Sequence, residues 1–353
     1  MGGHAILHAT RLPADHYYLA AGTCLARLRA VCGSTRRLAA IPAVRTKADF
    51  GDIDILVEYS GPKGLDRETC TQALDATEVV RNGPVLSCGV PLVALGFAEY
   101  PENAVVQVDL IGVSPAHFDS ALAYFSWNDC GNLLGRVAHN MGLKLGHDGL
   151  SYVLRRGTRV LATLPLATDW GIILPVLGYD VRRWWAGFDT LEDMFAFVAS
   201  GRFTDPAFFP LEHRSHKARV RDAKRPSYRA FLRYIQDHPV AHPPPLRDKP
   251  DWLPYLFAAI PGFRDRYDQA WAQDRLQQAI KTRYNGAVIG RWTGLPGPDL
   301  GQFMRVYQDH KGGLAGLAAY VAAHTNLELF TDVRAFQQAY SLNAIGRNEG
   351  GAS

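Results

Sequence analysis

Two aspartates in residues 51–57 carry the most suggestive chemistry of this chain. Asp52 and Asp54 are separated by one aliphatic residue inside an otherwise apolar run. On a β-strand, residues two apart point to the same face, so the two carboxylates would project side by side. Adjacent carboxylates repel each other, and a divalent ion such as Mg²⁺ relieves that repulsion and suits chemistry on phosphates. The alternative is a strand edge with two solvated aspartates.

Asp109 is a third acid, and it stands in the middle of an apolar, β-forming run at residues 104–113. Burying an unpaired charge there would be expensive. One interpretation is a bulge or edge position that faces water. The other is a third carboxylate that faces Asp52 and Asp54 from a neighbouring strand. Three such carboxylates would hold two metal ions, one to lower the pKa of an attacking hydroxyl and one to neutralise a triphosphate.

Apolar periodicity predicts the elements that would position these acids. The predicted helices are residues 13–31 and 68–79, and the predicted strands are residues 38–44, 52–58, 92–100 and 104–113. Pro42 marks the first of these strands as an edge strand or a strand start. A turn signal at residues 101–103 predicts that the last two strands form an antiparallel hairpin.

Composition sets the broad class of the chain. Its 353 residues, 47% hydrophobic and 20% charged, are typical of a soluble globular protein with two or three domains. No apolar run is long enough to cross a bilayer, and the N-terminus does not resemble a signal peptide. Five cysteines without a C-x-x-C pair argue against a disulfide framework or a zinc ribbon and predict a cytoplasmic location. The net charge of +4 permits a polyanionic partner.

The residues downstream of Asp109 follow a recognisable order. They are Tyr124, Phe125, Asp129, Asn132 and Arg136. With Gly51-Asp-Ile-Asp and the third acid before them, they make the sequence similar to the DNA polymerase beta (family X) branch of the nucleotidyltransferase superfamily, over about residues 13–210. Their spacing also places Asp129, Asn132 and Arg136 on one helical face. The alternative for that face is an ordinary polar helix surface.

The resemblance implies an α+β fold with a nucleotidyltransferase palm on a mixed sheet, an α+β thumb and a helical C-terminal domain. It implies that Asp52 and Asp54 bridge two Mg²⁺ ions, for which Mn²⁺ can substitute. Asp109 would complete the shell of the catalytic ion and help to deprotonate a primer 3′-hydroxyl. Arg45 would contact the β- and γ-phosphates of a nucleoside triphosphate.

The resemblance also implies how the nucleotide and the nucleic acid are held. Tyr124 and Phe125 would line the sugar pocket, Asp129 and Asn132 would face the incoming base, and Arg136 would reach the template strand. The full nucleotide-binding set implied is Arg45, Lys47, Gly51, Tyr124, Phe125, Asp129 and Asn132.

Two positions depart from the family pattern. Ile41-Pro42 stands where family members carry the Gly-Ser turn that cradles the triphosphate, and proline supplies no N–H. Either Arg45, Thr46 and Lys47 take over phosphate binding, or a gap displaces the turn. Trp127 stands where family members have glycine, which bears on sugar selectivity. The family's N-terminal lyase domain also has no counterpart before the palm, so a base-excision role that depends on it is not expected.

A basic stretch with interleaved aromatic residues begins after residue 212. It favours contact with a phosphate backbone, and the alternative is a solvated linker helix. The predicted nucleic-acid contacts are Arg136, Lys217, Arg219, Arg221, Lys224 and Arg225. A Pro-rich break follows at residues 238–245. The predicted domains are a palm at 1–120, a thumb at 121–212, a basic and Pro-rich linker at 213–250 and a helical domain at 251–353.

The leading hypothesis is an enzyme, a metal-dependent nucleotidyltransferase that adds nucleotides to a nucleic-acid 3′-OH. Its predicted partners are a nucleoside triphosphate and a DNA primer–template, as for a DNA polymerase beta-like polymerase. A short segment within residues 284–305 resembles CCA-adding and poly(A)-adding enzymes, so a tRNA or RNA 3′ end is the alternative acceptor. A catalytically silent nucleic-acid-binding protein is the alternative of another class, because Ile41-Pro42 disrupts the phosphate turn.

Overall fold

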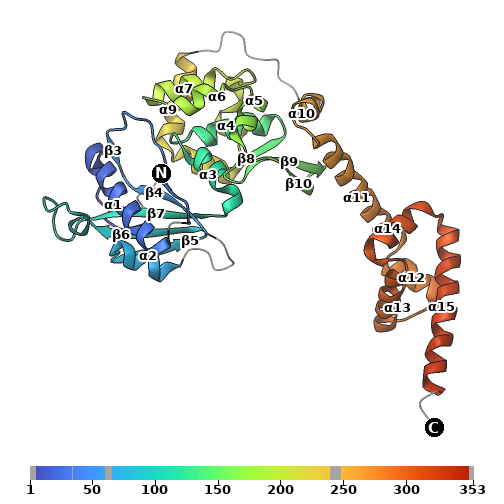
Figure 1. Cartoon of the computed structure of the whole chain (residues 1–353). Coiled ribbons are helices and arrows are strands. Elements are labelled where there is room, and N and C mark those ends of the chain that lie inside the picture. Colours follow the sequence, from blue (N-terminus) through green and yellow to red (C-terminus); the bar gives the residue numbers. More distant parts are fainter. Residues whose placement is uncertain (1–4, 34, 60–65, 239–247, 350–353) are drawn as a thin grey trace. The chain divides into compact units, whose positions relative to one another are not determined.

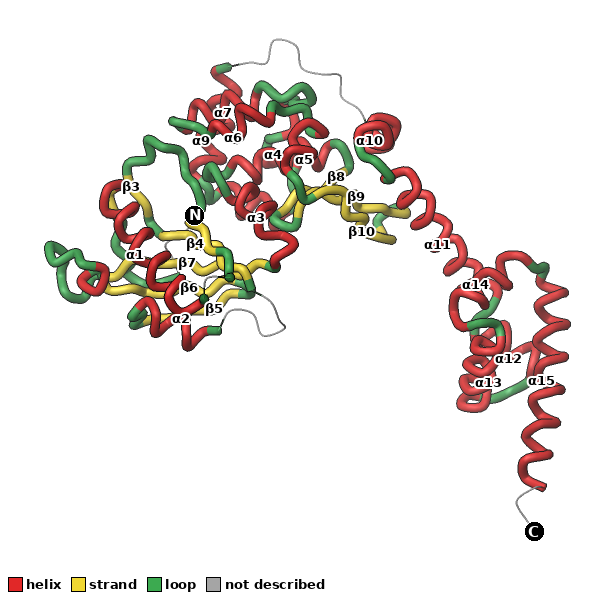
Figure 2. Tube along the Cα trace, viewed as in Figure 1, coloured by secondary structure: helices red, strands yellow, loops and turns green. Residues whose placement is uncertain are grey.

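The computed structural model describes residues 5–33, 35–59, 66–238 and 248–349. The chain divides into two compact units. The first consists of Met1–Val153 with Thr163–Pro261, and the second of Leu154–Ala162 with Gly262–Ser353. Strands are confined to the earlier part of the chain, and the described residues after β10 contain helices, turns and loops (Figures 1 and 2).

A five-stranded mixed sheet is the centre of the first unit. Its strands lie in the order β2 (Leu38–Ala40), β4 (Ile53–Glu58), β7 (Val105–Val113), β6 (Val85–Pro91) and β5 (Glu78–Asn82). β4 and β7 run parallel, and the other neighbouring pairs run antiparallel. This mixed sheet with helices around it confirms the predicted α+β class.

Alternation along β4 and β7 gives the sheet two different faces. Apolar side chains such as Ile55 and Val108 belong to a core cluster that packs against α1 (Ala14–Cys32) and α2 (Arg67–Leu74) (Figure 1). Residues between them point to the opposite face, because side chains alternate along a strand. The acids of β4 and β7 are on that opposite face, away from α1 and α2.

The predicted elements of this sheet are largely present, but the helix predicted at residues 68–79 ends at Leu74, and β5 and β6 were not predicted. The helix at residues 13–31 is α1, and the strand at residues 104–113 is β7. The predicted strand at residues 92–100 is wrong. Its place in the antiparallel pair with β7 is taken by β6, because the chain turns at Val93–Leu95 and Gly96 adopts a left-handed conformation.

Helices dominate the rest of the first unit. α3 (Phe118–Phe125) and α4 (Cys130–Asn140) lead to a three-stranded sheet in the order β10 (Arg159–Ala167), β9 (Gly149–Arg156) and β8 (Leu143–Gly146). The further helices are α5 (Trp170–Val176), α6 (Val181–Ala186), α7 (Leu191–Ala199), α8 (His216–Ala223), α9 (Pro226–Asp237) and α10 (Leu253–Ala259). Buried aromatic rings join them, including the stacked pair Trp170 and Trp184.

The second unit is helical apart from the hairpin tip at residues 154–162. It contains α11 (Phe263–Arg283), α12 (Gly286–Thr293), α13 (Gly297–His310), α14 (Gly313–Ala323) and α15 (Asn326–Glu349). Its core is built from buried side chains such as Ile289, Phe303, Tyr307 and Val321. Among the described residues of the whole chain, no helix is long and apolar enough to cross a membrane.

The four-part domain division predicted from the sequence stays a prediction. Residues 239–247 of the predicted linker lie outside the described residues. Before them, α8 and α9 are ordered helices, and Tyr228 and Phe231 of α9 are fully buried. This part of the predicted linker therefore packs into the first unit.

Candidate active site

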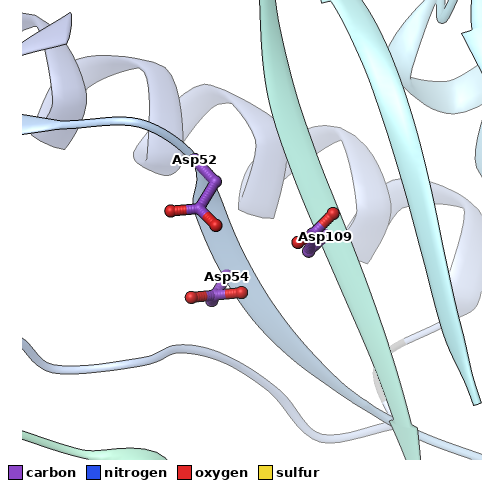
Figure 3. A group of neighbouring side chains, drawn as sticks. All are labelled: Asp52, Asp54 and Asp109. Carbon is purple, nitrogen blue, oxygen red and sulfur yellow. The ribbon is translucent and has the colours of Figure 1, made fainter. Parts of the chain in front are cut away.

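Three carboxylates meet on the open face of the five-stranded sheet (Figure 3). The parallel register of β4 and β7 places Asp54 directly opposite Asp109. Asp52 precedes β4 by one residue and lies on the same side as Asp54 (Figure 3). One oxygen from each of the three carboxylates lies within 4.8 Å of the others. The structure therefore brings together the three acids singled out from the sequence.

The surroundings of the three carboxyl groups disfavour their ionisation. Burial, and after it the charges of Asp52 and Asp109, raise the pKa of Asp54 to about 8. Burial also raises the pKa of Asp52, with Asp109 as the next cause. For Asp109, burial raises the pKa while hydrogen bonds from Ser87 and Gln107 lower it. Three half-buried carboxylates that disfavour one another's ionisation fit a hard divalent cation, which prefers oxygen ligands.

Gln107 is a residue of this site that the sequence analysis missed. Its Nε2 donates to both oxygens of Asp109 at 2.9 and 3.0 Å. Its Oε1 accepts hydrogen bonds from the backbone N–H groups of Ala5 and Ile6, both at 3.1 Å. The side chain is 2% exposed, so its orientation is fixed by these bonds. A polar residue two positions before Asp109 in an apolar strand was the signal that could have revealed it.

A cleft of about 1050 Å³ opens over the triad. Its walls come from several elements of the first unit: the loop between β2 and β4, the end of α3, the turn before α4, and the starts of α7 and α9. The cations that line it are Arg11, Lys47 and Arg225. Acids on the floor and cations on the walls give a site that can hold metal ions and phosphates together.

The loop at residues 41–47 has most of its amides in use. Ile41 N–H donates to the carbonyl of Asp54 at 3.0 Å, and Val44 N–H donates to Oδ1 of Asn128 at 3.1 Å. The N–H groups of Arg45 and Thr46 donate to the carbonyls of Phe188 and Asp189 at 3.1 and 2.9 Å. Since Pro42 has no N–H, this loop does not offer a run of free amides to a phosphate.

Arg45 and Lys47 of this loop have different surroundings. The guanidinium of Arg45 donates to Asp189 at 2.7 Å and to the carbonyl of Ala186, and it is not among the residues that line the cleft. Lys47 lines the cleft, with its Nζ 4.1 Å from the ring centre of Phe50. Burial lowers the pKa of Lys47, and the charges of Asp52 and Asp54 oppose that shift. Lys47 is thus the loop cation that faces the triad.

The aromatic residues at the end of α3 and in the turn after it have different surroundings. Phe125 lines the cleft, whereas Tyr124 does not. Trp127 adopts a left-handed conformation with φ 63° and packs edge-on against Phe188, with ring centres 5.6 Å apart. The indole therefore serves as packing for residues 187–188, and it is not among the cleft-lining residues.

The predicted base-reading face of α4 is engaged by α8 and α9. Asp129 lines the cleft and accepts from Arg225 and from the hydroxyl of Ser227. Asn132 accepts from Arg221 at 3.3 Å. Arg136 is buried and donates to the carbonyl of Phe208 at 2.8 and 3.1 Å, so its reach to a template strand stays a prediction.

The predicted nucleic-acid-binding residues of α8 and its surroundings fall into two groups. Arg221 pairs with the fully buried Asp222 at 2.9 Å, and Arg225 pairs with Asp129. Lys217, Arg219 and Lys224 are exposed. The first group ties α8 and α9 to α4, and the second group faces solvent.

Comparisons with known proteins give a distant likeness. No protein-family model matches the sequence, and no curated protein matches it. Among solved structures, the chain is similar to Leishmania infantum polymerase beta in a ternary P/T complex, with 14% identity and a TM-score of 0.34 over 43% of this chain and 63% of that chain. A ternary gap complex of Leishmania infantum polymerase beta gives 12% identity and a TM-score of 0.33 over 42% and 53% of the two chains. The chain thus spans a little over half of these structures' length.

Proposed function

We propose that this chain is a metal-dependent nucleotidyltransferase that adds nucleotides to a nucleic-acid 3′-OH, most specifically as a DNA polymerase beta-like DNA polymerase. The observation that carries the proposal is the geometry of Asp52, Asp54 and Asp109 on the floor of a cleft whose walls supply cations. Three oxygen donors within reach of one ion suit Mg²⁺, and Mn²⁺ has the same ligand preference.

The triad would hold the metal ions. Asp52 and Asp54 would bind both ions, and Asp109 would complete the site of the ion nearest the attacking hydroxyl. When bound, such ions lower the pKa of the hydroxyl and neutralise charge on the phosphates. Gln107 would hold Asp109 in one orientation, because both hydrogen bonds that its Nε2 donates go to that carboxylate.

Side chains would replace the amide cradle in binding the triphosphate. Lys47 lines the cleft and faces the triad, so its ammonium is placed to meet phosphate charge. Arg225 also lines the cleft and would divide its guanidinium between Asp129 and a phosphate. Arg45, implied by the family resemblance, would have to exchange Asp189 for the phosphates.

The remainder of the cleft would hold the nucleoside. Its volume of about 1050 Å³ is at the upper end of the usual range for ligand pockets. Phe125 would pack against the sugar, with Gly51 allowing the backbone to pass close beside the phosphates. Asp129 would meet the base, while Tyr124 and Asn132 would support this wall from behind.

The test is incorporation of labelled nucleotides with Mg²⁺ or Mn²⁺ on three acceptors: a DNA primer–template, single-stranded DNA and tRNA. We expect extension of the primer–template and a loss of at least about 100-fold in Asp109→Ala, since general-base and metal-shell residues act on that scale. Asp119→Ala is the matched control, because Asp119 is an exposed acid outside the cleft.

The other outcomes each favour a different function. Extension of tRNA alone would replace the DNA polymerase proposal with an RNA terminal transferase. Tight binding of DNA without any incorporation would support the silent binding protein, for which the occupied amides of residues 41–47 are the favouring observation.

A further inference from the structure

Helix α9 begins in the wall of the cleft and leads away from it. Arg225, Pro226 and Ser227 line the cleft, and the helix continues to Asp237. Arg225 precedes the helix in an extended conformation, and Arg229 and Arg233 follow on the helix, four residues apart. With a rise of about 1.5 Å per residue, Arg229 and Arg233 are about 6 Å apart along the helix axis and on the same side of it. We call these three residues the α9 arginine row.

The burial pattern of α9 fixes which way this row faces. Tyr228, Phe231 and Ile235 are buried and form the inner face of the helix. The ring of Phe231 lies 4.8 Å from that of Phe209 and 5.4 Å from that of Phe195, so the helix cannot rotate without breaking aromatic packing. Arg229 and Arg233 are exposed on the other side.

Arg229 and Arg233, the two members of the row farther along α9, form no ion pair with the described residues. Among the described residues, neither Arg229 nor Arg233 lies within ion-pair distance of an acid, whereas Arg183, Arg214 and Arg221 each pair with one. Arg225 pairs with Asp129 in the cleft wall. An arginine guanidinium binds phosphate with two parallel hydrogen bonds, so Arg229 and Arg233 are available for that interaction.

We propose that the α9 arginine row binds the phosphate backbone of the nucleic-acid strand whose 3′ end enters the cleft. The proposal rests on the proposed function, because that function requires a strand to leave the cleft. The row starts among the cleft-lining residues, and the triad lies on the floor of the same cleft. The row therefore provides positive charge from the cleft outward along α9. The helix ends at Asp237, one turn after Arg233.

The test measures binding of labelled oligonucleotides by fluorescence anisotropy, with single-stranded DNA, a DNA primer–template and RNA of the same sequence as separate arms. The variant is Arg229→Gln with Arg233→Gln. We expect its affinity to fall about 10-fold or more at low salt. The slope of log K against log salt concentration should become less negative by about 1.5. The three arms show whether the bound phosphates belong to DNA, to RNA or to both.

The matched control is Arg29→Gln with Arg36→Gln. These two exposed arginines lie outside the cleft lining, and the control removes the same net charge. Equal losses of affinity in both double variants would show that binding depends only on net charge. That result would contradict the proposed role of the α9 arginine row. Failure of the wild-type protein to bind any of the three oligonucleotides at low salt would also overturn it. Thermal unfolding and Mn²⁺ titration of the row variant should match wild type, which excludes misfolding as the cause.

Different results would contradict the role of the α9 arginine row and the proposed enzyme function. Reduced binding in the row variant, with no nucleotide incorporation by wild type, would retain the row and reject the enzyme. Incorporation by wild type with an unchanged KM for the acceptor in the row variant would retain the enzyme and reject the row.

Discussion

At the residue scale, the site is defined by three negative charges that Ser87, Gln107 and Lys47 offset only in part. Asp52, Asp54 and Asp109 could be predicted from the sequence because an acid in an apolar strand is costly without a purpose. The partners of Arg45 and Arg136 could not be predicted. Those side chains meet the carbonyls of Ala186 and Phe208, which are far away in sequence and reached through loops.

Removing one acid of the triad should stabilise the metal-free protein. The pKa of Asp54 is about 8 in the folded state and near 4 in an unfolded chain, so the folded state holds an extra proton between those values. The stability of the metal-free protein therefore falls as pH rises from about 4 to 8. We expect Asp54→Asn to raise the free energy of unfolding at pH 8 by at least about 1 kcal/mol in EDTA.

Denaturant unfolding at several pH values would measure this effect. Mn²⁺ should stabilise the wild-type protein and leave Asp54→Asn unchanged, because the variant lacks the ligand. Asp119→Asn serves as the exposed control. A variant less stable than wild type at pH 8 would show that the triad is not strained by its own charge.

Gln107 should act on the reaction through Asp109. In Gln107→Glu, the acceptor for the N–H groups of Ala5 and Ile6 is kept, but the donor to Asp109 becomes a second carboxylate. We expect kcat to fall about 10-fold or more and the Mn²⁺ concentration for half-maximal activity to rise, with KM for the acceptor unchanged. In Gln107→Met both sets of bonds are lost, so thermal stability falls as well. If Gln107→Glu and Gln107→Met lose the same stability and both keep the metal dependence of wild type, Gln107 has only a structural role.

At the element scale, the two strands that carry Asp54 and Asp109 were predictable, whereas β5, β6 and the connections were not. Alternation along β4 and β7 predicted which residues face the site, and the parallel register then placed Asp54 against Asp109. The loop at residues 41–47 has no such periodicity. Its conformation is set by bonds to residues 128 and 186–189, which belong to other elements.

Arg45 offers a test of how that loop works. If Arg45 binds phosphate, Arg45→Ala should raise KM for the nucleoside triphosphate by about 10-fold, whereas Asp189→Ala should leave KM unchanged or lower it by freeing the guanidinium. Steady-state kinetics of both single variants and of the double variant would decide. Equal increases in KM for the two single variants, with no further increase in the double variant, would show that the pair serves only to hold the loop.

At the scale of the whole molecule, the chain combines two compact units that need not unfold together. The first contains the cleft, and the second contains α11 to α15 with the hairpin tip at residues 154–162. Sequence composition predicted a helical end of the chain. It did not predict that the hairpin tip belongs with that end, because Arg156 meets Asp274 across more than a hundred residues.

The ion pair between Arg156 and Asp274 should stabilise the second unit selectively. Asp274 is buried, while Arg156 is partly exposed and also lies over the ring of Trp271. Arg156→Ala would leave the carboxylate buried without its cation, so we expect the free energy of unfolding of this unit to fall by about 1–3 kcal/mol.

Scanning calorimetry should then show one transition moved to lower temperature, while the transition that Mn²⁺ raises stays in place. Arg159→Ala, an exposed arginine on the same hairpin, is the control and should move neither transition. A single transition that shifts in Arg156→Ala and also rises with Mn²⁺ would show that the two units unfold as one.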